Sequence, residues 1–174
     1  MWGIAALLLL MVLYGVVIFN RLISDRNQVR AAWSDIDVQL LRRHDLTKPL
    51  LEITQAYAQY ERTTLTRIAE LRSQAARTFA LKERAEVEQD LNTQIQQLLL
   101  LQESYPELKA SEQFLKLQRE LVDIEDHLQY ARRFYNGSVK QFNTRLQHFP
   151  ELIVAKLFFF RPAEFFSSDS SSPL

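Results

Sequence analysis

The N-terminal end of the chain is an unbroken apolar run, whereas apolar and polar positions alternate with helical spacing through most of the rest. Residues 2–19 read WGIAALLLLMVLYGVVIF and contain no charged side chain. As a helix rising about 1.5 Å per residue, this run spans roughly 27 Å, close to the thickness of bilayer hydrocarbon. It lacks the basic start and small-residue cleavage site of a signal peptide. We predict an uncleaved single-pass anchor over residues 1–23; a cleaved signal and a buried core helix are the alternatives.

A seven-residue repeat predicts a long last helix over residues 111–147. Its repeat positions follow each other in steps of four and three residues, and they are Leu117, Leu121, Ile124, Leu128, Ala131, Tyr135, Ser138 and Phe142. A second stripe widens the face that we expect to be buried, and its members are Leu115, Val122, Tyr130 and Phe134. A face of this width is typical of a helical bundle rather than a two-stranded coil.

Weaker patterns predict the helices between these two. The first soluble helix continues out of the membrane, and Pro49 predicts a kink or a new helix start near residues 45–49. The helical pattern then runs to a poorly marked end near residues 77–80. A third helix is predicted over residues 81–103, and Ser-Tyr-Pro-Glu at 104–107 is typical of a helix N-terminus. The predicted fold class is all-α, with a transmembrane helix followed by an antiparallel up-and-down bundle of about four long helices.

This organisation divides the chain into an anchor (1–23), a helical bundle (24–149), a short apolar segment (150–166) and a Ser-rich tail (167–174) expected to be disordered. The apolar segment is too short to span a bilayer. We expect it to pack on the bundle or to lie in the membrane interface. The residues predicted to contact the interface are Lys156, Phe158, Phe159, Phe160 and Arg161.

Composition excludes several classes of function. The 174 residues include no Cys, which excludes disulfides, thiolate metal sites and a cysteine nucleophile. The 21 basic and 21 acidic residues balance, which argues against nucleic-acid binding. The three His have no Glu three residues before them, and the three Gly form no phosphate loop. We therefore expect no catalytic residue, no metal and no cofactor.

The balanced net charge conceals a basic–acidic–basic pattern. Residues 20–79 and 127–174 carry more basic than acidic side chains, whereas residues 80–126 carry five basic and eleven acidic ones. Arg21, Arg26 and Arg30 follow the anchor closely, and no Lys or Arg precedes it. By the positive-inside rule, the bundle is predicted to lie in the cytoplasm.

Two polar features are candidates for interaction. The densest polar cluster, just before Pro49, is either a binding or switching site or a salt-bridged, solvated turn, and the solvated turn is the favoured interpretation. Two Tyr/Phe-Asn pairs recur seven residues apart; their Asn residues would set helix register if they face the bundle, which is favoured, and would bind a partner if they face outward. The candidate residues are Arg42, Arg43, His44, Asp45, Asn136 and Asn143.

Several sequence blocks resemble those of the LemA family, in order along nearly the whole chain. They are WSDIDVQL at 33–40, RRHDL at 42–46, YPELKA at 105–110, ARRFYN at 131–136 and FNTR at 142–145, followed by FP at 149–150 and EFF at 164–166. The resemblance implies an N-terminal membrane segment, an antiparallel helical bundle and no established enzymatic activity. A family relationship to a magnetosome membrane protein points to membrane organisation.

The function expected from these observations is that of a membrane-anchored adaptor or scaffold in the bacterial envelope, without catalysis. It would reside in the inner membrane as a single-pass protein. Its expected partners are the lipid bilayer, other membrane proteins and a second copy of itself, but not nucleic acid. The alternative is a membrane-remodelling or lipid-sensing protein that acts through its basic, Phe-rich C-terminal segment.

Overall fold

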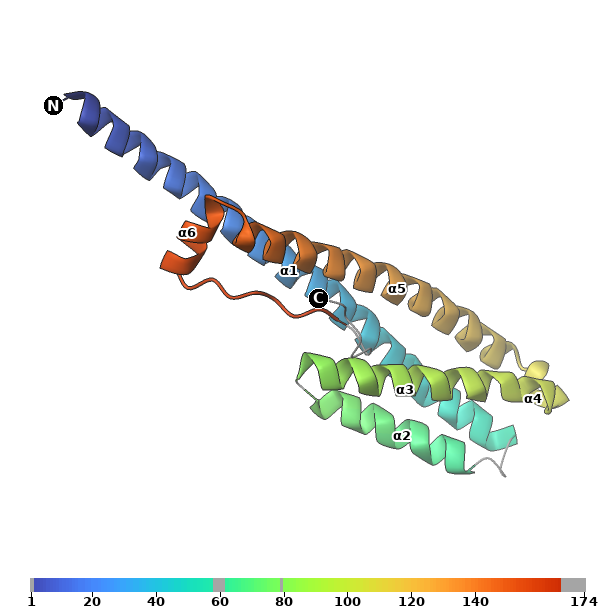
Figure 1. The fold of residues 1–174 in the computed structure, drawn as a ribbon. Coiled ribbons are helices and arrows are strands. Elements are labelled where there is room, and N and C mark those ends of the chain that lie inside the picture. Colours follow the sequence, from blue (N-terminus) through green and yellow to red (C-terminus); the bar gives the residue numbers. More distant parts are fainter. Residues whose placement is uncertain (1, 58–61, 79, 167–174) are drawn as a thin grey trace. The chain divides into compact units, whose positions relative to one another are not determined.

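The computed structural model describes residues 2–57, 62–78 and 80–166, and this part of the chain is all-α, as predicted (Figure 1). No strand occurs among these residues. The helices are α1 (Trp2–Tyr57), α2 (Arg62–Arg77), α3 (Leu81–Leu100), α4 (Pro106–Lys109), α5 (Glu112–Gln147) and α6 (Glu151–Leu157), with a 3₁₀ turn at Leu101–Glu103. Four of the six are the long helices that the bundle prediction requires.

The chain divides into two compact units. The first, called the anchor unit here, comprises residues 1–35 and 131–165. The second, called the bundle unit, comprises residues 36–130 and 166–174. Helices α1 and α5 contribute residues to both units, so each unit is built partly on the same two elements.

In the anchor unit, α5 runs antiparallel to α1, and α6 lies beside the N-terminal half of α1 (Figure 1). The α1 side chains up to Val17 are almost all exposed, and burial begins at Ile18 and Leu22. The buried side chains of α5 continue the predicted heptad through Ala131, Tyr135 and Phe142. The anchor unit therefore packs only from the end of the apolar run onward. Helix α1 is long and apolar enough to cross a membrane.

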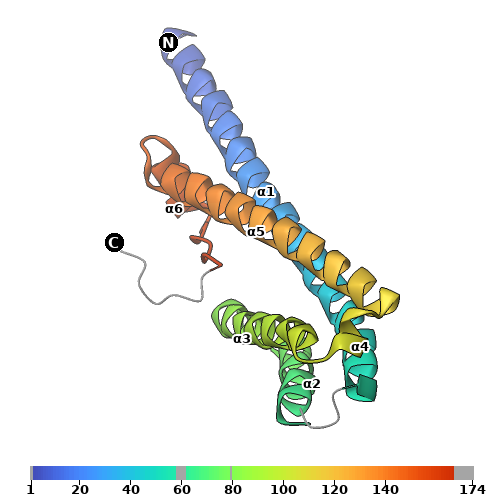
Figure 2. The ribbon, with the colours of Figure 1, turned by 90° about the vertical axis from the view of Figure 1, so that its right-hand side faces the viewer.

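In the bundle unit, α2 and α3 lie side by side (Figure 2). Their facing apolar side chains form one core with α4, the start of α5 and Leu50 of α1. The fully or nearly fully buried members include Leu50, Ile68, Leu71, Leu91, Ile95, Leu98, Leu108 and Phe114. Burial of such Leu, Ile and Phe side chains stabilises the folded state by roughly 1.5–3 kcal/mol each.

Several predicted boundaries are confirmed. Helix α2 ends at Arg77 and α3 begins at Leu81, within the predicted break. Pro106 is the first residue of α4, a position that tolerates the missing N–H of proline. The backbone N–H of Phe114 donates to the Ser111 hydroxyl at 3.4 Å, so the N-terminus of α5 has a side-chain acceptor.

Pro49 does not start a new helix, because α1 is continuous from Trp2 to Tyr57. Pro49 leaves the Asp45 carbonyl without its usual donor, but Asp45 is exposed, so water can bind that carbonyl. Core residues on both sides, Leu40 and Leu50, hold the helix in place through tertiary packing.

Two further expectations are wrong. The helical run expected between Pro49 and residue 80 is two helices, since α1 ends at Tyr57 and α2 begins at Arg62. The second stripe of α5 does not widen the buried face, because its neighbours cover the heptad stripe and leave the adjacent positions in solvent. Those exposed side chains are Leu115, Val122, Tyr130 and Phe134.

Candidate functional site

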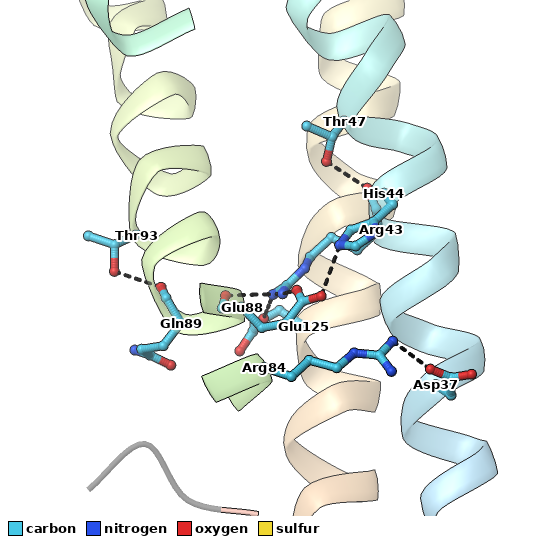
Figure 3. A network of polar contacts seen from close by, with 9 residues as sticks. All are labelled: Asp37, Arg43, His44, Thr47, Arg84, Glu88, Gln89, Thr93 and Glu125. Atoms are coloured by element: carbon cyan, nitrogen blue, oxygen red, sulfur yellow. Dashed lines mark hydrogen bonds and ion pairs between the residues drawn. The ribbon is translucent and has the colours of Figure 1, made fainter. Parts of the chain in front are cut away.

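A cluster of charged side chains lies inside the bundle unit (Figure 3). Arg43 of α1 is 1% exposed, and its guanidinium donates to the Glu88 carboxylate of α3, to the Glu88 carbonyl at 3.1 Å and to Glu125 of α5 at 3.4 Å. The His44 Nε2 lies 2.9 Å from the other carboxylate oxygen of Glu88, which is fully buried. One arginine thus joins three helices.

His44 and Arg43 keep the buried Glu88 carboxylate ionised. Burial raises the pKa of Glu88, but the hydrogen bond from His44 and the positive charge of Arg43 outweigh it, so the pKa is lowered from 4.5. Glu88 is therefore ionised at neutral pH and paired with Arg43. Removal of Arg43 would leave the fully buried Glu88 carboxylate without its arginine partner.

The structure divides the predicted Arg42–Asp45 cluster. Arg42 and Asp45 are exposed, and Arg42 donates to Gln39 on the surface at 3.2 Å. Arg43 is buried and His44 is mostly so. The solvated-turn interpretation is wrong for Arg43, because this residue faces the interior of a continuous helix and not solvent at a bend.

Sequence reasoning missed Glu88, although a signal was present. Arg43 stands in the buried stripe of α1, seven residues before Leu50 and three after Leu40. Glu88 stands in the buried stripe of α3, three residues before Leu91. Opposite charges at two core positions predict a buried pair, because an isolated charge there is very costly.

The surroundings of this cluster do not form a ligand site of usual size. A cavity of about 250 Å³ lies between α1, α2 and α3, and its rim carries an ion pair between Arg84 and Asp37 at 2.6 Å. Ligand pockets are usually about 300–1,000 Å³. Among residues 2–57, 62–78 and 80–166, no group of three or more His, Cys, Asp or Glu could hold a metal. What the contacts show is that the cluster joins α1, α3 and α5 within the bundle unit.

A second polar arrangement fastens the C-terminal segment to α5 within the anchor unit. The Asn143 amide donates to the Ala163 carbonyl and accepts from the Ala163 N–H, both at 2.8 Å. The Tyr135 hydroxyl donates to the Glu164 carbonyl at 2.9 Å, and burial together with the Glu164 charge raises the pKa of Tyr135. Asn143 thus binds this chain's own backbone, while Asn136 is half-buried.

The anchor unit has another polar tie between α1 and α5. Asp25 is buried, and its carboxylate accepts from Gln141 at 3.3 Å and pairs with Arg145 at 3.0 Å. These contacts lie one to two helical turns beyond the apolar run. The pairing of the two helices therefore begins close to the end of the predicted anchor.

The predicted interface residues lie beside that end. The Phe158 and Phe160 rings lie 4.7 and 5.9 Å from the Phe19 ring, measured between centroids. The Arg26 guanidinium lies 5.3 Å from the Phe160 ring centroid, within the range of a cation–π contact. Phe160 is half-buried by these contacts, whereas the other four predicted residues are exposed: Lys156, Phe158, Phe159 and Arg161.

Helix α6 ends with an unusual residue. The Phe160 N–H donates to the Ala155 carbonyl at 2.9 Å and the Phe159 N–H donates to the Lys156 carbonyl at 3.3 Å, the pattern of a Schellman C-cap. Phe159 takes the left-handed position of this motif, with φ of 55°. Glycine is the usual residue there, and a side chain costs roughly 1–2 kcal/mol.

Comparisons with known proteins agree on one family. The sequence profile of the LemA family matches residues 32–173. A protein of Metamycoplasma hominis named Protein LemA is 27% identical over 152 residues, which cover 86% of this chain and 69% of that protein. The profile match begins after the apolar run and includes the Arg43 cluster and the Asn143–Ala163 contact, but not Asp25.

Proposed function

The chain belongs to the LemA family, and we propose that it is a membrane-anchored adaptor. In this proposal the apolar part of α1 crosses the bacterial inner membrane once, and the bundle unit offers its surface to other membrane proteins or to a second copy. No chemical reaction is assigned to it. The bundle is proposed to lie on the cytoplasmic side because the arginines closest to the anchor follow it.

The continuity of α1 is the observation that carries this proposal. One unbroken helix contains both an apolar window that is only 6% buried and the core residues Leu40 and Leu50 of the bundle unit. A partner that binds the bundle unit would thereby be tied to the bilayer through α1 itself. This arrangement suits a protein whose role is to hold others at a membrane.

The exposed apolar side chains of the bundle unit supply candidate docking positions. Leu41 on α1 and Tyr130 on α5 are both exposed, and Leu41 stands directly before Arg42, which is exposed as well. An exposed tyrosine or leucine can serve as an anchor for a binding partner, so these two positions are the ones to probe.

Site-specific photocrosslinking in intact cells tests the adaptor role. A benzophenone amino acid is placed at Leu41 or at Tyr130, and Gln74, an exposed polar position of α2, serves as the matched control. We expect discrete crosslinked products with membrane proteins or a second copy at the first two positions and none at Gln74. Absence of any product while the chain remains in the membrane fraction would contradict the adaptor role.

A further inference from the structure

Helix α6 exposes an apolar face that the anchor unit leaves uncovered. Ile153 and Leu157 are four residues apart, so they lie on the same side of this helix. Leu157 is 67% exposed, and the adjoining Phe158 and Phe159 are exposed as well. A contiguous apolar surface of this kind marks a contact with something other than water.

The position of this face identifies its surroundings. Phe19 is the last residue of the apolar run, which places it at the edge of the hydrocarbon when α1 spans a bilayer. The rings of Phe158 and Phe160 pack against Phe19, so the end of α6 is fixed at that level. Side chains at this depth meet the boundary between lipid headgroups and acyl chains.

The backbone conformation of Phe159 supports the same conclusion. Its side chain is 87% exposed, so it gains little from packing within the protein. Its φ of 55° is a conformation that favours glycine. A bulky residue kept in a strained conformation without internal contacts indicates a use for its side chain outside the protein.

Charge identifies the kind of lipid. Lys156 and Arg161 are exposed on either side of the three phenylalanines. Residues 1–35 and 131–165 together contain nine basic and four acidic side chains. A basic surface next to a bilayer attracts anionic headgroups.

We propose that the end of α6 is embedded in the headgroup region of an anionic phospholipid bilayer. Ile153, Leu157, Phe158 and Phe159 insert toward the acyl chains, and Lys156 and Arg161 contact lipid phosphates. The segment forms a second membrane contact beside the spanning helix, with Phe159 as its insertion residue. This inference rests on the anchoring of α1 in the proposed function.

Spin labels on the full-length chain test the contact directly, because the chain has no cysteine of its own. Single variants Leu157→Cys, Leu9→Cys and Leu100→Cys are labelled with a nitroxide and reconstituted in vesicles of phosphatidylcholine and phosphatidylglycerol. Leu9 lies within the predicted span, and Leu100 is an exposed apolar position of the bundle unit. The readout is the ratio of label accessibility to oxygen over that to a water-soluble nickel chelate.

We expect the ratio at residue 157 to be several-fold higher than at residue 100 and lower than at residue 9. Equal ratios at 157 and 100, with a high ratio at 9, would overturn the inference and leave the anchor intact. A low ratio at residue 9 would overturn the anchor itself. Spin–spin broadening between labels at residue 157 would show that a second copy covers this face, which also overturns the inference.

Two further arms address Phe159 and the lipid charge. In the Leu157→Cys background, Phe159→Gly is expected to lower the ratio toward that at residue 100, while Phe159→Trp retains it. Vesicles of phosphatidylcholine alone are expected to lower the ratio at 157 and leave that at 9 unchanged. If the ratio at residue 157 stays the same in Phe159→Gly and in vesicles of phosphatidylcholine alone, the roles of Phe159 and of anionic lipid are overturned.

Discussion

The anchor unit and the bundle unit share α1 and α5 but bury these helices differently. In the bundle unit, α2, α3 and α4 add enough cover to enclose an apolar core and a charged cluster around Arg43. In the anchor unit, the first sixteen described residues of α1 have almost no protein cover, and the packing that follows is supplemented by polar ties at Asp25 and Asn143. The same helix, α1, thus buries side chains in the core of one unit and leaves most of its N-terminal side chains exposed in the other.

The two units also differ in net charge. Residues 36–130 contain twelve basic and sixteen acidic side chains, in contrast to the basic excess of the anchor unit. The basic side chains that follow the apolar run and those after residue 131 are far apart in sequence, but they belong to one unit because α5 returns along α1. A neutral chain therefore contains one unit suited to an anionic membrane surface and another that is not.

The largest effect is expected from Arg43→Ala, which leaves Glu88 buried without its cation. We expect the bundle unit to lose about 3–5 kcal/mol of stability, measured by hydrogen exchange in α2 and α3. Arg42→Ala is the matched control, since Arg42 is exposed, and it should change stability by less than about 0.5 kcal/mol. The double variant Arg43→Met/Glu88→Leu should recover much of the loss. Equal effects at 42 and 43 would show that the charged cluster is not buried.

The same cluster predicts a pH dependence for the bundle unit. Because the pKa of Glu88 is lowered in the folded state from 4.5, its ionised form stabilises the fold above that value. This contribution is lost as the pH falls below 4.5 and through the lower, folded-state pKa. Urea unfolding of the wild type should weaken over this range, and Glu88→Gln should lose that component. An unchanged acid profile in Glu88→Gln would contradict the assignment.

Asn143→Ala tests the anchor unit, where it removes both hydrogen bonds to Ala163. We expect a local loss of about 1–3 kcal/mol, seen as faster hydrogen exchange at the Ala163 amide. The neighbouring Thr144→Ala, at an exposed position, is the control. Neither variant should show faster exchange in the bundle unit; a large increase there would contradict the separation of the two units.

The smallest effect is a gain. Gly137 lies in the middle of α5 on the anchor unit, and a Cβ added there would meet nothing within 4 Å. Gly137→Ala should therefore raise the stability of the anchor unit by about 0.5–1 kcal/mol through helix propensity. Thermal unfolding followed by circular dichroism measures it, with Gln129→Ala in the same helix as a control. A loss of stability would contradict the open space around a Cβ at this position.

The sequence alone determined the local structure. The uncharged run identified the membrane-spanning candidate, and the heptad stripe from Leu117 to Phe142 identified α5 and its buried side. The break before Leu81 and the start at Pro106 followed from the end of one pattern and a capping signal. These features depend on side chains within a few turns of each other, which is why periodicity and turn chemistry reveal them.

The tertiary structure alone decided which distant residues meet and which faces are covered. Pro49 stayed inside α1 because packing on both sides holds that helix, and the second stripe of α5 stayed exposed because no neighbour reaches it. Arg43 contacts Glu88, which is 45 residues away in the sequence, and Asn143 contacts Ala163, which is 20 residues away. Such pairings depend on how helices pack after the chain has folded back on itself. A one-dimensional pattern records that a position is inward or charged, but not what lies opposite it.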